Sequence, residues 1–162
     1  MKIRKNLWIL NIIGGIITLF AILTPTSYND TGPILYIVWM NQIGVDVEPL
    51  AIYLLRTDVT LVLVSTILAL IIFSSALIVI VITFIYLRAS LSFRKLQWKA
   101  IVLTLLVIVS TITWIVMMEL FYNRFGANHW TFTGGGYSPY FGVIGPFIGA
   151  VLIILGSFVR RK

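Results

Sequence analysis

Residues 59–87 read VTLVLVSTILALIIFSSALIVIVITFIYL, a long apolar run that contains no charged residue. An α-helix of about 20 apolar residues crosses a bilayer core that is about 30 Å thick. The run is long enough to span a membrane with residues to spare. It is therefore predicted to be a membrane-spanning helix that tilts or projects beyond the bilayer.

Three further apolar segments have the length of a spanning helix, at about residues 7–24, 99–122 and 140–159. Hydrophobic residues make up 60% of the 162-residue chain and charged residues only 10%, whereas soluble domains carry roughly 25% charged residues. The segments lack the apolar–polar alternation of membrane barrel strands. The predicted fold class is an all-α integral membrane protein, in which residues 1–162 form a single four-transmembrane-helix bundle.

The basic residues predict how this bundle is oriented. Ten of the twelve lysines and arginines precede the first segment, lie in or near an inner loop of about residues 88–98, or follow the fourth segment. Loops rich in Lys and Arg stay in the cytoplasm, so both termini are predicted to be cytoplasmic and the protein to lie in the cell membrane. These clusters attract anionic lipid headgroups at the inner face, and their distribution argues against a nucleic-acid partner.

The two outer loops are predicted to span about residues 25–58 and 123–139. Residues 33–40 are β-branched and aromatic and are bounded by turn residues, which favours a short strand, and residues 129–133 favour another. Residues 47–55 could form a further strand or a short helix. We therefore expect a small extracellular β-sheet built from the two outer loops.

A glycine face is predicted on the fourth helix. Gly142, Gly145, Gly149 and Gly156 fall broadly on one side of it, and Gly145 and Gly149 form a GxxxG motif. Small residues allow helices to approach closely inside a membrane. The sequence leaves two partners open for this face, a helix of the same bundle or a second subunit. The glycine pair at residues 14–15 offers a similar contact in the first helix.

Few side chains have the chemistry of a reactive site. Glu119 falls near the outer headgroups by its distance along the third helix, where it could form an interfacial ion pair with Arg124 or Arg56. His129 is the only histidine and shows no metal-ligand spacing with an acidic residue. The sequence has no cysteine, which excludes disulfides and thiol chemistry. No catalytic residue, cofactor or metal ligand is predicted, and we do not expect an enzyme.

Residues 37–41 (Ile-Val-Trp-Met-Asn), Arg56 just before the second helix and the glycine-bearing fourth helix resemble the claudin and peripheral-myelin type of four-helix membrane protein. That type has cytoplasmic termini and a long first outer loop with a Gly-Leu-Trp motif followed by two cysteines. In this chain Ile37-Val38 replaces Gly-Leu, and Gln42 stands where the first cysteine would fall. The resemblance implies a small outer β-sheet above a left-handed bundle, and a role in adhesion, membrane organisation or lateral assembly.

The leading functional hypothesis is a non-enzymatic multi-pass membrane protein with such a role. Trp and Tyr are favoured at protein interfaces, so Trp39 and Trp130 of the outer loops are candidate contact residues, together with Arg56 and the four glycines. The expected partners are membrane lipids and other membrane-protein chains, in a homo- or hetero-oligomer. One alternative is an accessory subunit of a larger transporter, channel or oxidase complex. A second is a small transporter or channel, whose polar path the Ser and Thr residues of the helices could line.

Overall fold

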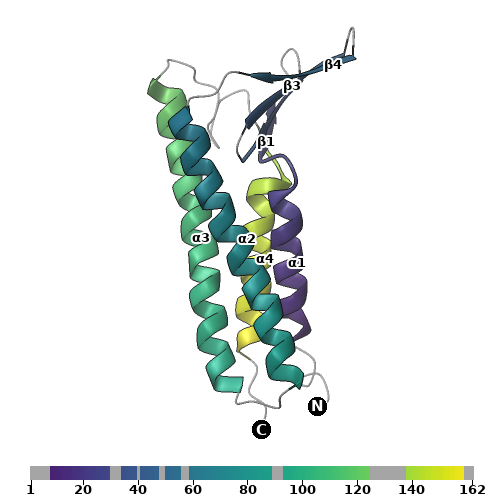
Figure 1. Cartoon of the computed structure of the whole chain (residues 1–162), viewed down its shortest axis with the longest axis vertical. Helices are drawn as coiled ribbons and strands as arrows, with labels where there is room; N and C mark the ends of the chain where they lie inside the picture. The colour runs from purple at the N-terminus through teal and green to yellow at the C-terminus, as the bar shows by residue number, and fades with distance from the viewer. Residues whose placement is uncertain are drawn as a thin grey trace.

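The structure is a computed structural model, which describes residues 8–29, 34–39, 41–47, 50–55, 59–88, 93–124 and 138–158. Four helices stand side by side as a bundle, and strands gather beyond one end of it (Figure 1). The elements follow the order α1 (Ile9–Ile22), β1 (Ser27–Asn29), β2 (Ile34–Val38), β3 (Asn41–Val47), β4 (Leu50–Leu55), α2 (Val59–Arg88), α3 (Phe93–Arg124), β5 (Ser138–Pro139) and α4 (Phe141–Ser157).

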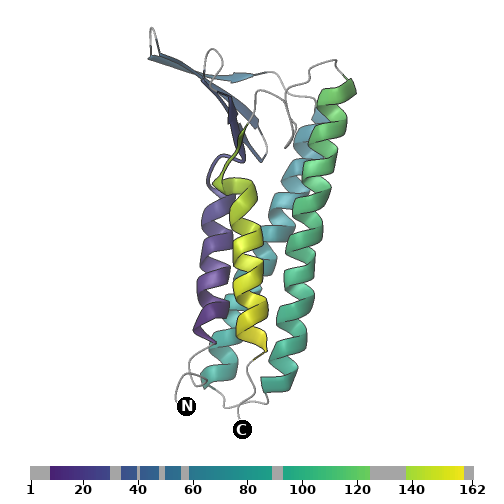
Figure 2. The ribbon, with the colours of Figure 1, turned by 180° about the vertical axis from the view of Figure 1, so that it is seen from behind.

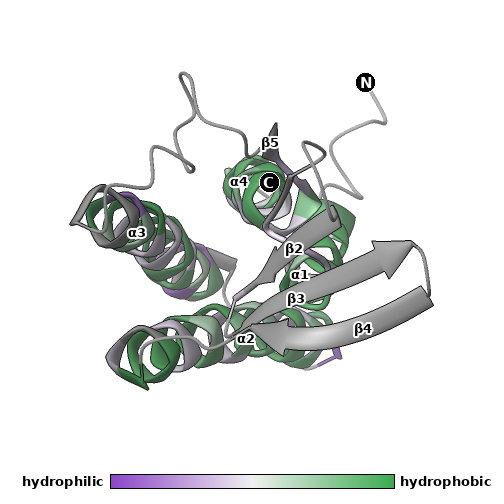
Figure 3. Cartoon of the chain, turned by 90° about the horizontal axis from the view of Figure 1, so that it is seen from above, coloured by the Kyte–Doolittle hydropathy of each residue, from purple (hydrophilic) through white to green (hydrophobic). Residues whose placement is uncertain are grey.

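Each helix packs against its neighbours in sequence, and α4 returns to lie beside α1. The contact between α1 and α4 is the most extensive between any two helices, and Figure 2 shows the two running side by side. The start of α1 and the end of α4 lie at the same end of the bundle as the end of α2 and the start of α3. Viewed along the helices, the described residues of the bundle are coloured mostly as apolar (Figure 3).

The bundle consists of a long pair of helices and a short pair. α2 has 30 residues and α3 has 32, whereas α1 has 14 and α4 has 17. At about 1.5 Å per residue, only the long pair exceeds the roughly 30 Å of a bilayer core. Within the described residues, α2 and α3 are therefore the helices long and apolar enough to cross a membrane.

The end of α1 is tied to the start of α4 through the backbone. α1 ends at Ile22, shortly before Pro25, which has no N–H to continue a helix. The Pro25 carbonyl accepts a hydrogen bond from the Gly142 N–H at 2.8 Å, and the Thr26 carbonyl accepts one from the Tyr140 N–H at 2.8 Å. These bonds satisfy amides at the helix start, which have no partner within the helix.

Glycines bring the two short helices into backbone contact. A Cβ added to Gly149 would lie 2.5 Å from the Gly14 carbonyl oxygen, and one added to Gly14 would lie 2.5 Å from the Gly149 carbonyl oxygen. One turn away, a Cβ on Gly145 would lie 2.6 Å from the Cβ of Ala21. No larger residue fits at these positions without moving the helices apart.

The strands form an antiparallel arrangement through backbone pairing, in the order β4-β3-β2-β1-β5. β2 and β3 pair with Val38 opposite Asn41, so Trp39 lies in the tight connection between them. The two residues of β5 pair with β1, which links the segment before α4 to the segment after α1. Four of the five strands therefore come from the chain between α1 and α2.

The fold class predicted from the sequence is wrong. Among the residues whose side chains the structure describes, the elements are the four helices, and the expected extracellular β-sheet is not seen there. The expected strand at residues 129–133 lies outside the described residues. Two helices of the described part, rather than four, are long and apolar enough to span a membrane. Strand propensity identifies extended segments, but it does not determine whether their side chains pack into a sheet.

We expect Gly149→Leu to destabilise the bundle, because the new side chain must displace the backbone of α1. Overpacking of this kind costs about 1–3 kcal/mol, and the melting temperature of the detergent-solubilised protein should fall. The matched control is Val151→Leu on the same helix, where Val151 is exposed and added bulk meets no neighbour. Equal melting temperatures for the two variants would contradict the close approach of α1 and α4.

Candidate functional site

The glycine face predicted on the fourth helix packs inside the chain. Gly145 and Gly149 face Ala21 and Thr18 of α1, and Gly142 faces Pro25 just beyond it. All four glycines of this face are buried. Of the two partners that the sequence left open, the structure places a helix of the same bundle against this face.

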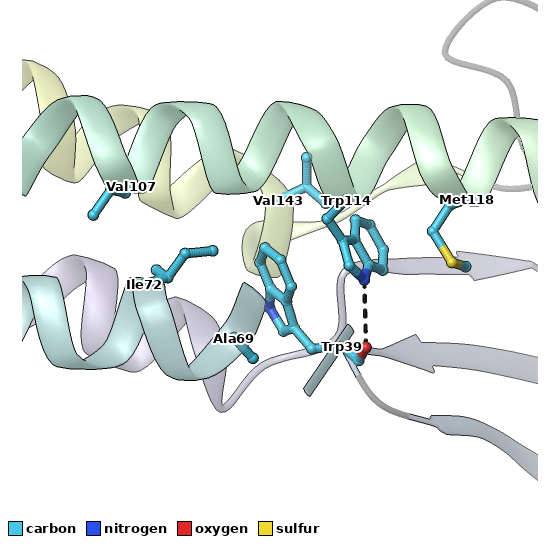
Figure 4. Close-up of a cluster of buried hydrophobic side chains, with 7 residues drawn as sticks. All are labelled: Trp39, Ala69, Ile72, Val107, Trp114, Met118 and Val143. Atoms are coloured by element: carbon cyan, nitrogen blue, oxygen red, sulfur yellow. Dashed lines mark hydrogen bonds between the residues drawn. The ribbon is translucent and has the colours of Figure 1, made fainter. Parts of the chain in front are cut away.

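Trp39 is buried against the long helices. Its side chain is 1% exposed, and its ring centroid lies 4.8 Å from that of Trp114 on α3, with the ring planes tilted by 47°. Tilted aromatic pairs contribute about 0.5–1.5 kcal/mol beyond the burial of their area. The surrounding cluster consists of buried apolar residues from three helices (Figure 4): Ala69, Ile72, Val107, Met118 and Val143.

A shared hydrogen bond fixes the position of Trp39. The Trp114 Nε1–H donates to the Trp39 carbonyl oxygen at 3.3 Å and to the Ser65 hydroxyl oxygen at 3.2 Å. The Nε1–H of Trp39 itself is buried and finds no acceptor among the described residues. Trp39 thus anchors the connection between β2 and β3 in the bundle through its contacts with Trp114. It is a packing residue rather than a surface contact.

The other predicted candidates are only partly described. Arg56 and Trp130 lie outside the described residues, and so does the side chain of Arg124, although its backbone ends α3. Glu119 is half-buried on α3. The predicted ion pair between Glu119 and Arg124 therefore stays a prediction.

Sequence reasoning missed a buried polar side chain between α1 and α4. Asn11 is fully buried, and its side-chain oxygen lies where a Cβ on Gly156 would be. Both polar atoms of the Asn11 amide lack a hydrogen-bond partner among the described residues, and so does the buried hydroxyl of Ser157. The signal was present in the sequence, because Asn11 interrupts an otherwise apolar run and Gly156 permits a close neighbour.

Most of the buried threonine hydroxyls bond to their own helix. Thr18 donates to the Gly14 carbonyl at 2.9 Å, and Thr83, Thr104 and Thr111 each donate to the carbonyl four residues earlier at 2.7–2.8 Å. A hydroxyl in this arrangement donates its hydrogen to a backbone carbonyl of its own helix. These threonines therefore act as small, satisfied packing residues.

The described residues contain no group of three or more His, Asp or Glu side chains that could hold a metal ion. The described residues of the site combine apolar packing, one shared indole hydrogen bond and close helix contacts.

No protein-family model matches the chain, and the curated proteins compared with it give no match.

We expect Trp114→Phe to destabilise the protein, because the substitution removes the donor that the buried Trp39 carbonyl has among the described residues. Leaving a buried acceptor unsatisfied costs about 1–3 kcal/mol, so thermal unfolding in detergent should begin at a lower temperature. Trp98→Phe is the matched control, since Trp98 is 66% exposed. If both variants had the melting temperature of the wild type, the proposed anchoring of Trp39 would be refuted.

Proposed function

We propose that the chain is a non-enzymatic, multi-pass membrane protein that acts through lateral contacts with lipids and other membrane chains. The single observation that carries the proposal is the distribution of its apolar side chains. Large apolar residues point outward on all four helices, and Leu63, Leu70, Leu120 and Val151 are each more than half exposed. An exposed apolar surface of this extent marks contact with a membrane or with protein.

The inward-facing residues support the same proposal. Helix contacts in a membrane favour small and hydroxylated residues, because lipid tails already solvate the large apolar ones. Gly14, Thr18, Ala21 and Gly149 occupy the contact between α1 and α4, and all four are buried. A water-soluble bundle would place large apolar residues there and polar ones outside.

In the topology that we propose, both termini lie in the cytoplasm. Arg88 and Lys99 are exposed at the end of the bundle where α2 ends and α3 begins, and a concentration of basic residues favours the cytoplasmic side. α1 and α4 would measure about 21 and 26 Å. Helices of that length are accommodated by local thinning of the bilayer or by flanking residues that reach the interface.

The role that we propose is lateral assembly or membrane organisation, and the resemblance to the claudin and peripheral-myelin type supports it. The contact surface differs from the one expected from sequence. Trp39 is buried, so we assign contacts to the outward faces of the helices instead.

The second candidate is an accessory subunit of a larger membrane complex, which one feature of α3 favours. Exposed apolar residues recur every three or four positions along it, the spacing of one helix face. This stripe offers a continuous ridge for another transmembrane helix. Its members are Val102, Leu105, Val109, Ile112, Val116 and Leu120. A transport path finds less support, because the buried threonines bond to their own helices.

The test is to wash native membranes with alkaline carbonate, solubilise them gently and identify the proteins that co-elute with this chain by mass spectrometry. We expect the chain to resist the wash and to elute alone or as copies of itself. A chain released by the wash would overturn the membrane proposal. A fixed set of larger subunits would replace the leading role with that of an accessory subunit.

A further inference from the structure

An apolar groove lies between the two long helices, near the end of the bundle where α2 ends and α3 begins. It has a volume of about 460 Å³, and its walls expose almost no polar surface. Such a shape suits a hydrocarbon chain better than a polar solute. The lining residues are Ile78 and Ile82 of α2, with Trp98, Lys99, Val102 and Leu103 of α3.

The groove has a basic mouth. Lys99 is the charged residue among the described residues that line it, and its ammonium lies 5.9 Å from the centroid of the Tyr86 ring, within the range of a cation–π contact. Trp98 is exposed here, and tryptophan is enriched where a membrane protein meets the headgroup region.

The apolar groove and the basic mouth together match the two ends of a phospholipid. From Tyr86, which contacts Lys99, back to Ile78 the helix extends about 12 Å, so the groove leads from the charged mouth toward the interior of the proposed membrane. A zwitterionic lipid would place its own cation beside Lys99, whereas a net negative headgroup complements it.

We propose that this groove binds an acyl chain of an anionic glycerophospholipid, whose phosphate pairs with Lys99. The inference deepens the proposed function and depends on it, because the groove opens to lipid only if the chain lies in a membrane. It assigns a specific site to the general attraction between the basic residues and anionic headgroups.

The test is native mass spectrometry of the full chain in detergent, with an equimolar mixture of dioleoyl phosphatidylglycerol and dioleoyl phosphatidylcholine. We expect the wild type to retain phosphatidylglycerol preferentially. Lys99→Gln should reduce this preference about fivefold, the contribution of one basic residue near a lipid surface. Lys99→Arg keeps the charge and should preserve the preference.

A second variant tests the groove itself. Val102→Trp fills its wall and should reduce the binding of both lipids, whereas Val109→Trp adds the same bulk to an exposed position of α3 outside the groove and should leave binding unchanged. Melting temperatures of the four variants confirm that each is folded. If Val102→Trp fails to fold, Val102→Phe takes its place.

Equal retention of the two lipids by the wild type would overturn the inference, and so would variants at Lys99 and Val102 that bind like the wild type. If the Val102→Trp variant lost a co-purifying protein but kept its lipid, the groove would be assigned to a partner helix instead. Failure of the proposed function is distinguishable, because the carbonate wash would then release the chain from the membrane.

Discussion

The backbone contact between α1 and α4 is the constraint on which the rest of the bundle depends. The Gly14 carbonyl oxygen lies 2.5 Å from the position of a Cβ on Gly149, and the Gly149 carbonyl oxygen lies 2.5 Å from that of a Cβ on Gly14. The two helices therefore touch along their backbones. Dispersion contacts of this closeness are a main source of helix association in a membrane, where burying apolar surface gives no advantage. The bonds from Tyr140 and Gly142 to the residues after α1 then close one end of the pair.

The long helices complete the bundle by a different kind of packing. α2 and α3 enclose Trp39, whose indole lies against that of Trp114 and whose carbonyl accepts the Trp114 N–H. The connection between β2 and β3 is thereby fixed to the helices. The outward faces of the long pair keep their large apolar residues exposed, and in the proposed role these residues contact lipid or a neighbouring chain. The interior thus holds small residues where α1 meets α4 and a tryptophan pair beside the long helices, and the exterior is apolar.

The apolar runs were enough to predict where the four helices lie, because hydropathy and length depend on local sequence alone. The partner of the Gly145–Gly149 motif was left open, since a small-residue face is equally suited to a helix of the same chain or of another. Trp39 was placed at an outer surface, because the burial of a loop residue depends on packing that no local pattern reports. For the same reason, Asn11 was noticed only as an interruption of an apolar run.

The most direct test of this account uses the absence of cysteine from the sequence. Ala21→Cys and Gly145→Cys are combined in one chain, oxidised in the membrane and analysed by mass spectrometry. A disulfide needs Cβ atoms about 3.8 Å apart. A Cβ on Gly145 would lie 2.6 Å from that of Ala21, so the bond can form if the two helices separate by about 1 Å at this point. The account predicts a bond within one chain, and none for Ala21→Cys with the outward-facing Val151→Cys. Covalent dimers, or thiols that stay free in the first pair, would contradict it.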